Sequence, residues 1–161
     1  MDYVNVILTS YPRLDKLILG YKECVSMRCR TSCYLVEPVE KTFFKIYEKK
    51  IILEKLAILK KKIDILLSRL NEEERALIYI KYFDIKPQVK FGFSLRTYFR
   101  KQKKLKEKIK KYLSYLGIDE KSFEEDYMSI SFFQMMKIRC EEIKRKNGTS
   151  SLEAIFLAKT V

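Results

Sequence analysis

The sequence predicts an all-α protein, a helical bundle with a long central helix and a helix-turn-helix. Only four Gly and three Pro occur in 161 residues, too few for the tight turns of a β-rich fold. Hydrophobic residues make up 47% and charged residues 34%, a balance typical of a chain that folds around a core. The apolar residues of the middle third recur at steps of three and four, which is the helical period.

The first 33 residues are expected to be helical. An apolar opening, "YVNVIL", continues into "RLDKLILGYKECVSM". Pro12 suits the start of a helix better than its interior, so two helical pieces are an open alternative. Thr31, Ser32 and Pro38 predict a loop.

A long helix is predicted from Val39 to Leu70. Its main apolar seam alternates steps of four and three and consists of Ile52, Leu56, Leu59, Ile63, Leu66 and Leu70. A second stripe, a third of a turn away, consists of Ile51, Ile58 and Ile65. Two apolar faces indicate a helix packed among several partners, and a homodimer through this helix is an open alternative.

The next helix begins in "LNEEERALIYIKYFD". Asn71 is a preferred N-cap residue, and Glu74 stands where a capping-box acid belongs. We interpret the acids at 72–74 as capping and first-turn residues of the helix. A catalytic carboxylate pair would need a partner residue in a pocket, and the sequence shows none.

A short segment, "KPQVKFGF" at 86–93, leads into the basic helix. Pro87 suits a first helical turn and Gly92 a turn position. Ser94 is the expected N-cap of a helix from Leu95 to Leu116, which Gly117 should end.

Further helices are expected toward the carboxyl end. Asp119 should cap "EKSFEEDYM", and "SFFQMMKIRCEEIKRK" predicts another helix. "NGTSS" breaks the pattern before "LEAIFLAKTV", a short helix or tail. We divide the chain into a helical part with the long helix at 1–69, a helix-turn-helix at 70–117 and a helical part at 118–161.

Positive charge is concentrated between Lys86 and Lys111. This segment holds eleven Lys or Arg and one acid, Glu107, and so carries +10 of the chain's net +13. Such a concentration favours a polyanionic partner. On a helical wheel one arc should face the core, formed by Leu95, Tyr98, Gln102, Leu105, Ile109, Tyr112, Leu113 and Leu116. Pointing away are Arg96, Thr97, Arg100, Lys103, Lys104 and Lys111.

The outward residues favour nucleic acid. Two Arg and a Thr in the first two turns are typical of a recognition helix, and the lysines beyond them suit phosphates. Solvated helix faces usually mix signs, and this one barely does. A solvated or protein-facing surface stays an alternative, as does RNA stacking on Tyr98 or Phe99.

Other classes of function are disfavoured. The chain has no His and no Gly-rich phosphate loop, so we expect no enzyme and no cofactor. Cys24, Cys29, Cys33 and Cys140 lack zinc spacing and are expected to be buried or inert thiols. The acids at 119–126 could mask the basic helix, although helix-end solvation is favoured. We also expect neither a membrane-spanning segment nor a secretory signal, and we expect the protein to be cytoplasmic.

The order of these features resembles the carboxy-terminal helix-turn-helix, region four, of bacterial sigma factors and sigma-like regulators of phages and Gram-positive bacteria. The matching pattern covers about 45 residues. It includes Leu70, Glu72, Glu74, Arg75 and the pair Lys81–Tyr82, followed by Ser94, Arg96, Thr97 and Tyr98. "KPQVKFGF" is about one turn shorter than the family's scaffold helix and lacks its Ala and Glu, which implies a different setting of the two helices.

The resemblance implies binding of duplex DNA in the major groove by a transcriptional regulator, with RNA polymerase as a further candidate partner. The expected DNA-contacting residues are Lys90, Ser94, Arg96, Thr97, Arg100, Lys101, Lys103 and Lys104. A helical protein-interaction adaptor and an RNA-binding protein are the alternatives.

Overall fold

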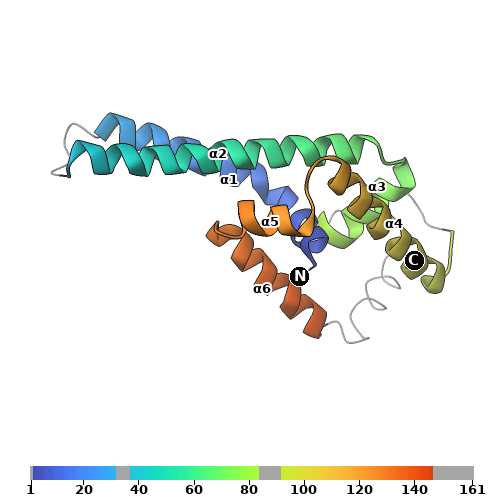
Figure 1. The fold of residues 1–161 in the computed structure, drawn as a ribbon. Coiled ribbons are helices and arrows are strands. Elements are labelled where there is room, and N and C mark those ends of the chain that lie inside the picture. The colour runs from blue at the N-terminus through green and yellow to red at the C-terminus, as the bar shows by residue number, and fades with distance from the viewer. Residues whose placement is uncertain (1, 32–36, 84–91, 147–161) are drawn as a thin grey trace. The chain divides into compact units, whose positions relative to one another are not determined.

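The computed structural model describes residues 2–31, 37–83 and 92–146 (Figure 1). Within those ranges the chain is helical and contains no strand, so the all-α prediction is confirmed. The elements are α1 (Tyr3–Thr31), α2 (Val39–Ser68), α3 (Glu72–Ile78), the π-helical turn η2 (Tyr79–Phe83), α4 (Leu95–Tyr115), α5 (Glu120–Tyr127) and α6 (Ser131–Lys146).

The chain forms two compact units. Unit 1 combines Met1–Ser10 with Ile65–Val161, and unit 2 is Tyr11–Asp64. These units cut across the three segments expected from the sequence, because the first turns of α1 are buried with the later helices. Val4 and Ile7 are 1% and 0% exposed.

Unit 2 is an antiparallel helical hairpin. Hydroxyl Oη of Tyr11 donates to Asp64, Asp15 forms an ion pair with Lys60, and the Lys49 ammonium lies 5.7 Å from the centre of the Tyr21 ring. Partner numbers on α2 fall as those on α1 rise, which defines the antiparallel direction. In the predicted heptad seam, Leu56, Leu59 and Ile63 are all fully buried.

Pro12 lies inside a continuous helix, so the two-piece alternative for the first segment is wrong. The side chain is exposed, and α1 runs through it from Tyr3 to Thr31. Proline removes one backbone donor, which leaves the carbonyl four residues earlier without its usual partner.

The core of unit 1 gathers around Phe123. Its ring stacks on Tyr127 at 5.3 Å, meets Phe133 edge-on at 5.5 Å and lies 6.3 Å from Tyr3, each distance between ring centroids. Phe123 and Phe133 are fully buried. These aromatic contacts join α1, α5 and α6 in one core.

The predicted helix ends are confirmed. Asn71 and Glu74 form a reciprocal capping box, with Asn71 Oδ1 accepting from the Glu74 N–H at 2.8 Å. Ser94 caps α4, and Asp119 caps α5. Gly117 adopts a φ of 72°, a left-handed conformation that glycine adopts without steric cost.

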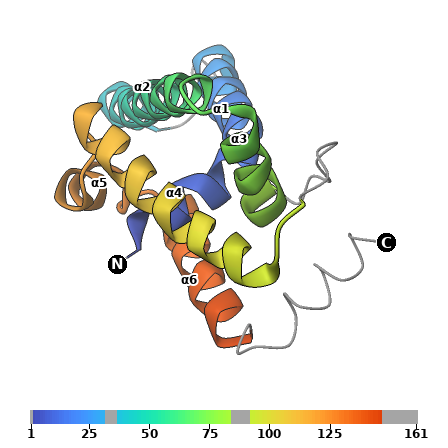
Figure 2. The ribbon, with the colours of Figure 1, turned by 90° about the vertical axis from the view of Figure 1, so that its right-hand side faces the viewer.

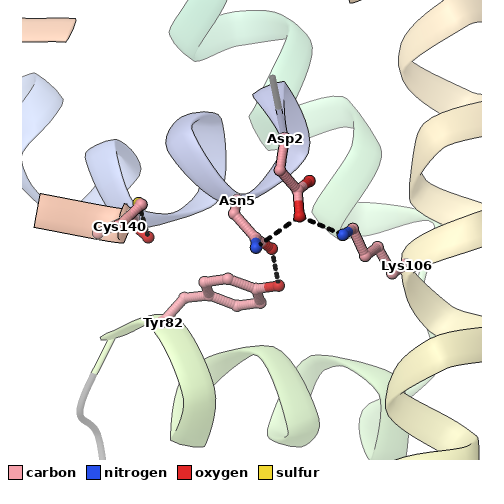
Figure 3. Close-up of polar contacts among 6 residues, drawn as sticks. Asp2, Asn5, Tyr82, Lys106 and Cys140 are labelled. Atoms are coloured by element: carbon pink, nitrogen blue, oxygen red, sulfur yellow. Dashed lines mark hydrogen bonds and ion pairs between the residues drawn. The ribbon is translucent and has the colours of Figure 1, made fainter. Parts of the chain in front are cut away.

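A chain of polar contacts ties the first turn of α1 to η2 and α4 (Figure 3). Tyr82 Oη donates to Asn5 Oδ1 at 2.6 Å, and Asn5 Nδ2 donates to Asp2 Oδ2 at 2.8 Å. The same Asp2 oxygen forms an ion pair with Lys106. Burial raises the pKa of Tyr82 well above its usual value, and the charge of Asp2 adds to this effect.

Replacing Tyr82 with Phe removes the donor to Asn5 and should lower the free energy of unfolding by about 1 kcal/mol. It should also change the response to alkali. Since the folded state raises the pKa of Tyr82, wild-type stability is complete below the unfolded pKa of about 10 and falls as the pH rises above it. Tyr82→Phe should therefore lose less stability between neutral pH and alkaline pH in denaturant titrations. An equal loss in both proteins would contradict the raised pKa.

Candidate nucleic-acid interface

α4 has one buried stripe. Its buried members are Tyr98, Gln102, Leu105, Ile109 and Leu113, while Leu95, Tyr112 and Leu116 are half-buried. The core-facing arc predicted from the sequence is therefore confirmed. Because this stripe is buried, the opposite arc of the helix is the one exposed to solvent.

The one amide of this stripe uses both of its N–H donors. Gln102 is 6% exposed, and its Nε2 donates to the Leu77 carbonyl at 2.9 Å and to Tyr98 Oη at 3.2 Å. The Leu77 carbonyl lies near the junction of α3 with η2. A buried amide with correct partners fixes the rotation of α4 more strictly than an apolar side chain of the same size does.

Lysines along both edges of the stripe form ion pairs with other parts of unit 1. Their partners lie on α3 and just before α1. The pairs are Lys101 with Glu73, Lys106 with Asp2, and Lys108 with Glu74. Lys101 also lies over the Phe93 ring, 4.5 Å from its centroid. These lysines hold α4 in place, so their charge is already matched within the chain.

The arc opposite the stripe is different. Its members are exposed and make no ion pair with any residue in 2–31, 37–83 or 92–146. We call its cations the basic face, which consists of Arg96, Arg100, Lys103, Lys104 and Lys111; Glu107 is the one acid on this arc of α4. From first to last it spans about 22 Å of helix. Figure 2 shows α4 crossing the near side of unit 1, between α3 and α5.

The predicted DNA-contacting residues separate into groups. Four lie on the basic face: Arg96, Arg100, Lys103 and Lys104. Ser94 and Thr97 form the helix cap, where Ser94 Oγ accepts from the Thr97 N–H at 3.4 Å. Lys101 is in an ion pair. Lys90 lies outside the described residues, as do residues 86–91 of the predicted lead-in segment at 86–93.

Lys111 belongs to the basic face although the predicted site omits it. Its place in the same arc of the helical wheel was the available signal. Phe99, at the edge of this face, is 45% exposed and meets Tyr98 edge-on at 5.5 Å between centroids. An exposed ring beside unpaired cations is a surface on which a base can stack.

Two of the acids at 119–126 act within α5 and its cap. Asp119 accepts from the Ser122 N–H at 2.8 Å, and this bond lowers the pKa of its carboxyl. Glu125 lies 3.9 Å from Lys121, one turn away. These contacts agree with a role of these two acids within the helix end.

The described cysteines and carboxylates do not gather into a metal site. Cys24 and Cys140 are half-buried and Cys29 is exposed, while Cys33 lies outside the described residues. Residues 2–31, 37–83 and 92–146 contain no group of three or more His, Cys, Asp or Glu able to hold a metal ion. Among the described helices, none combines the length and apolarity that crossing a membrane requires.

No family model, curated protein or solved structure matches the chain. The resemblance to sigma-factor helix-turn-helices stays a prediction based on residues 70–114.

The two classes of lysine on α4 should differ in their effect on stability. Lys106→Met breaks the ion pair with Asp2 and should lower the free energy of unfolding by about 1 kcal/mol. Lys103→Met, on the basic face, should change it by less than about 0.5 kcal/mol. Urea unfolding of both variants measures the difference. Equal losses would show that the ion pair does not hold α4.

Proposed function

We propose that this protein is a DNA-binding transcriptional regulator that lays α4 in the major groove of duplex DNA. The observation that carries the proposal is the basic face, a set of cations on one exposed arc of a helix whose other arc is buried. Phosphates are the partners that neutralise such a surface.

The folded chain gains no described ion pair from this face. The lysines that join α4 to its neighbours are a separate set at the edges of the buried stripe. Repulsion between like charges four residues apart, such as Arg96 and Arg100, costs a few tenths of a kcal/mol. A polyanion would turn this cost into binding energy.

The geometry suits a major groove. An α-helix with side chains is about 10–12 Å across, and the groove is about 12 Å wide. Arg96 and Arg100 lie one turn apart near the amino-terminal end, where a recognition helix meets base edges. Lys103, Lys104 and Lys111 follow along the same arc, and lysines contact phosphates as point charges.

Single-stranded RNA is a second candidate because Phe99 lies exposed beside the basic face. Aromatic stacking contributes about 1–3 kcal/mol per base in single-strand binders. Competition between duplex DNA and single-stranded RNA of equal length separates the two. Phe99→Ala should weaken RNA binding strongly and leave duplex DNA binding nearly unchanged.

Salt dependence tests the phosphate contacts. If Arg96, Arg100, Lys103 and Lys104 each neutralise one phosphate, the logarithm of the binding constant should fall against the logarithm of salt with a slope of about −3 to −4. Fluorescence anisotropy with genomic duplex fragments at several salt concentrations measures this slope. A flat response would rule out the electrostatic contacts.

Charge reversal tests the helix itself. The double variant Arg96→Glu/Arg100→Glu should abolish DNA binding. Lys16→Glu/Lys22→Glu, two exposed positions of α1, changes the net charge equally and is the matched control, expected to bind as the wild type does. Normal binding by the α4 variant would exclude α4 as the DNA-contacting helix. Co-purification with RNA polymerase without binding to free DNA would favour the adaptor alternative.

A further inference from the structure

The arc of α4 that carries the basic face also holds an acid that the phosphate contacts do not use. Glu107 is exposed on this arc, and it is the one acid in the sequence of α4. An acid on a surface that meets phosphates weakens binding, because it repels each phosphate that comes near. Its position among five cations therefore needs a separate explanation.

Glu107 has no ion-pair partner within the fold. Helical ion pairs ordinarily join residues four positions apart, and Lys103 and Lys111 stand at those positions. Glu107 pairs with neither of them, nor with any other cation in 2–31, 37–83 or 92–146. The acids that hold α4 come instead from α3 and from the residue before α1. The carboxylate of Glu107 is thus available to a partner.

Glu107 lies in line with the two arginines of the basic face. At 100° per residue, Arg96, Arg100 and Glu107 fall within about 40° of one another, and we call these three side chains the central line. Lys103 lies on one side of this line and Lys104 on the other. In the proposed complex the central line faces the floor of the major groove, where base edges are exposed, and the flanking lysines face phosphates.

A carboxylate at the floor of the groove selects its base by hydrogen bonding. An ionised carboxylate only accepts, and the donors in the major groove are the amino groups of cytosine and adenine. The adenine amino group lies between two acceptors, its own N7 and the O4 of thymine, and both repel a carboxylate. The cytosine amino group has an acceptor on one side only, the O6 of guanine. Cytosine is therefore the base that suits Glu107 best.

We propose that Glu107 accepts a hydrogen bond from a cytosine in the major groove and is a specificity-determining residue. This contact rests on the proposed binding of duplex DNA by α4. Glu107 lies seven positions after Arg100, which is about 10 Å along the helix, and successive base pairs are about 3.4 Å apart. The cytosine should accordingly lie about three base pairs from the base that Arg100 contacts. The repulsion from phosphates is then offset on sequences that carry this cytosine.

Selection from a library of duplex DNA with a randomised centre tests the base contact. The full-length wild type should enrich cytosine at one position. Glu107→Gln should enrich adenine at that same position, because a glutamine amide forms two hydrogen bonds with N6 and N7 of adenine. Glu107→Ala should show no preference there and should select the wild-type bases elsewhere. Both variants should keep the helical circular dichroism of the wild type, since Glu107 pairs with nothing in the fold.

Affinities for the selected duplex measure the size of the effect. Replacing the cytosine pair with an A·T pair should weaken binding by the wild type about tenfold, and binding by Glu107→Ala less than about twofold. Glu107→Ala should also bind duplexes of unrelated sequence more tightly, because one acid has left the arc. Glu23→Gln removes an exposed acid of α1 instead, and this matched control should select the same bases as the wild type.

Two different failures can be told apart. If the wild type and both Glu107 variants select the same bases, and both variants bind every duplex more tightly, Glu107 only repels phosphates and the base contact is overturned. DNA binding by α4 would stand in that case, provided that Arg96→Glu/Arg100→Glu abolishes it. If the wild type binds no duplex DNA, or if that double variant binds normally, the proposed function fails and the base contact fails with it.

Discussion

The fixed rotation of α4 is the constraint on which the rest of unit 1 depends. A helix this rich in lysine gains little from its own sequence, since its like charges repel one another one turn apart. It is held instead by a buried stripe and by the amide of Gln102, which binds the Leu77 carbonyl and Tyr98 Oη. Any rotation about the helix axis would bury a cation without a partner, which costs far more than the repulsion it relieves.

Three acids from outside α4 complete this arrangement. Asp2, Glu73 and Glu74 lie where the edges of the buried stripe bring lysines past them. Glu74 has two roles, since the same carboxylate closes the capping box of α3 and accepts from Lys108. The position of each lysine on α4 thus decides its role. Lysines at the edges of the buried stripe form ion pairs within the fold, and those on the opposite arc do not. The net charge does not distinguish these two groups. Only the lysines outside the ion pairs are available to bind a partner.

Capping preferences and helical periodicity predicted the helix ends and the buried stripe of α4 well. The caps at Asn71, Ser94 and Asp119, and the buried stripe of α4, follow from residue type and helical period, which act within a few positions. The sequence could not assign partners to individual lysines, because Lys106 and Asp2 are 104 positions apart. Nor did it predict η2 or the passage of α1 through Pro12. In both places tertiary packing of the surrounding helix outweighs the local preference.

Two exposed surfaces of this chain differ in chemistry. On α4 the exposed arc carries five Lys or Arg against one acid, Glu107, so its net positive charge favours a polyanion. On α2 one exposed face is apolar from Phe43 to Ile58, so contact there would remove apolar area from water and would neutralise no charge. Exposure alone therefore does not identify a partner, because the charge of the exposed side chains decides which class of partner a surface suits.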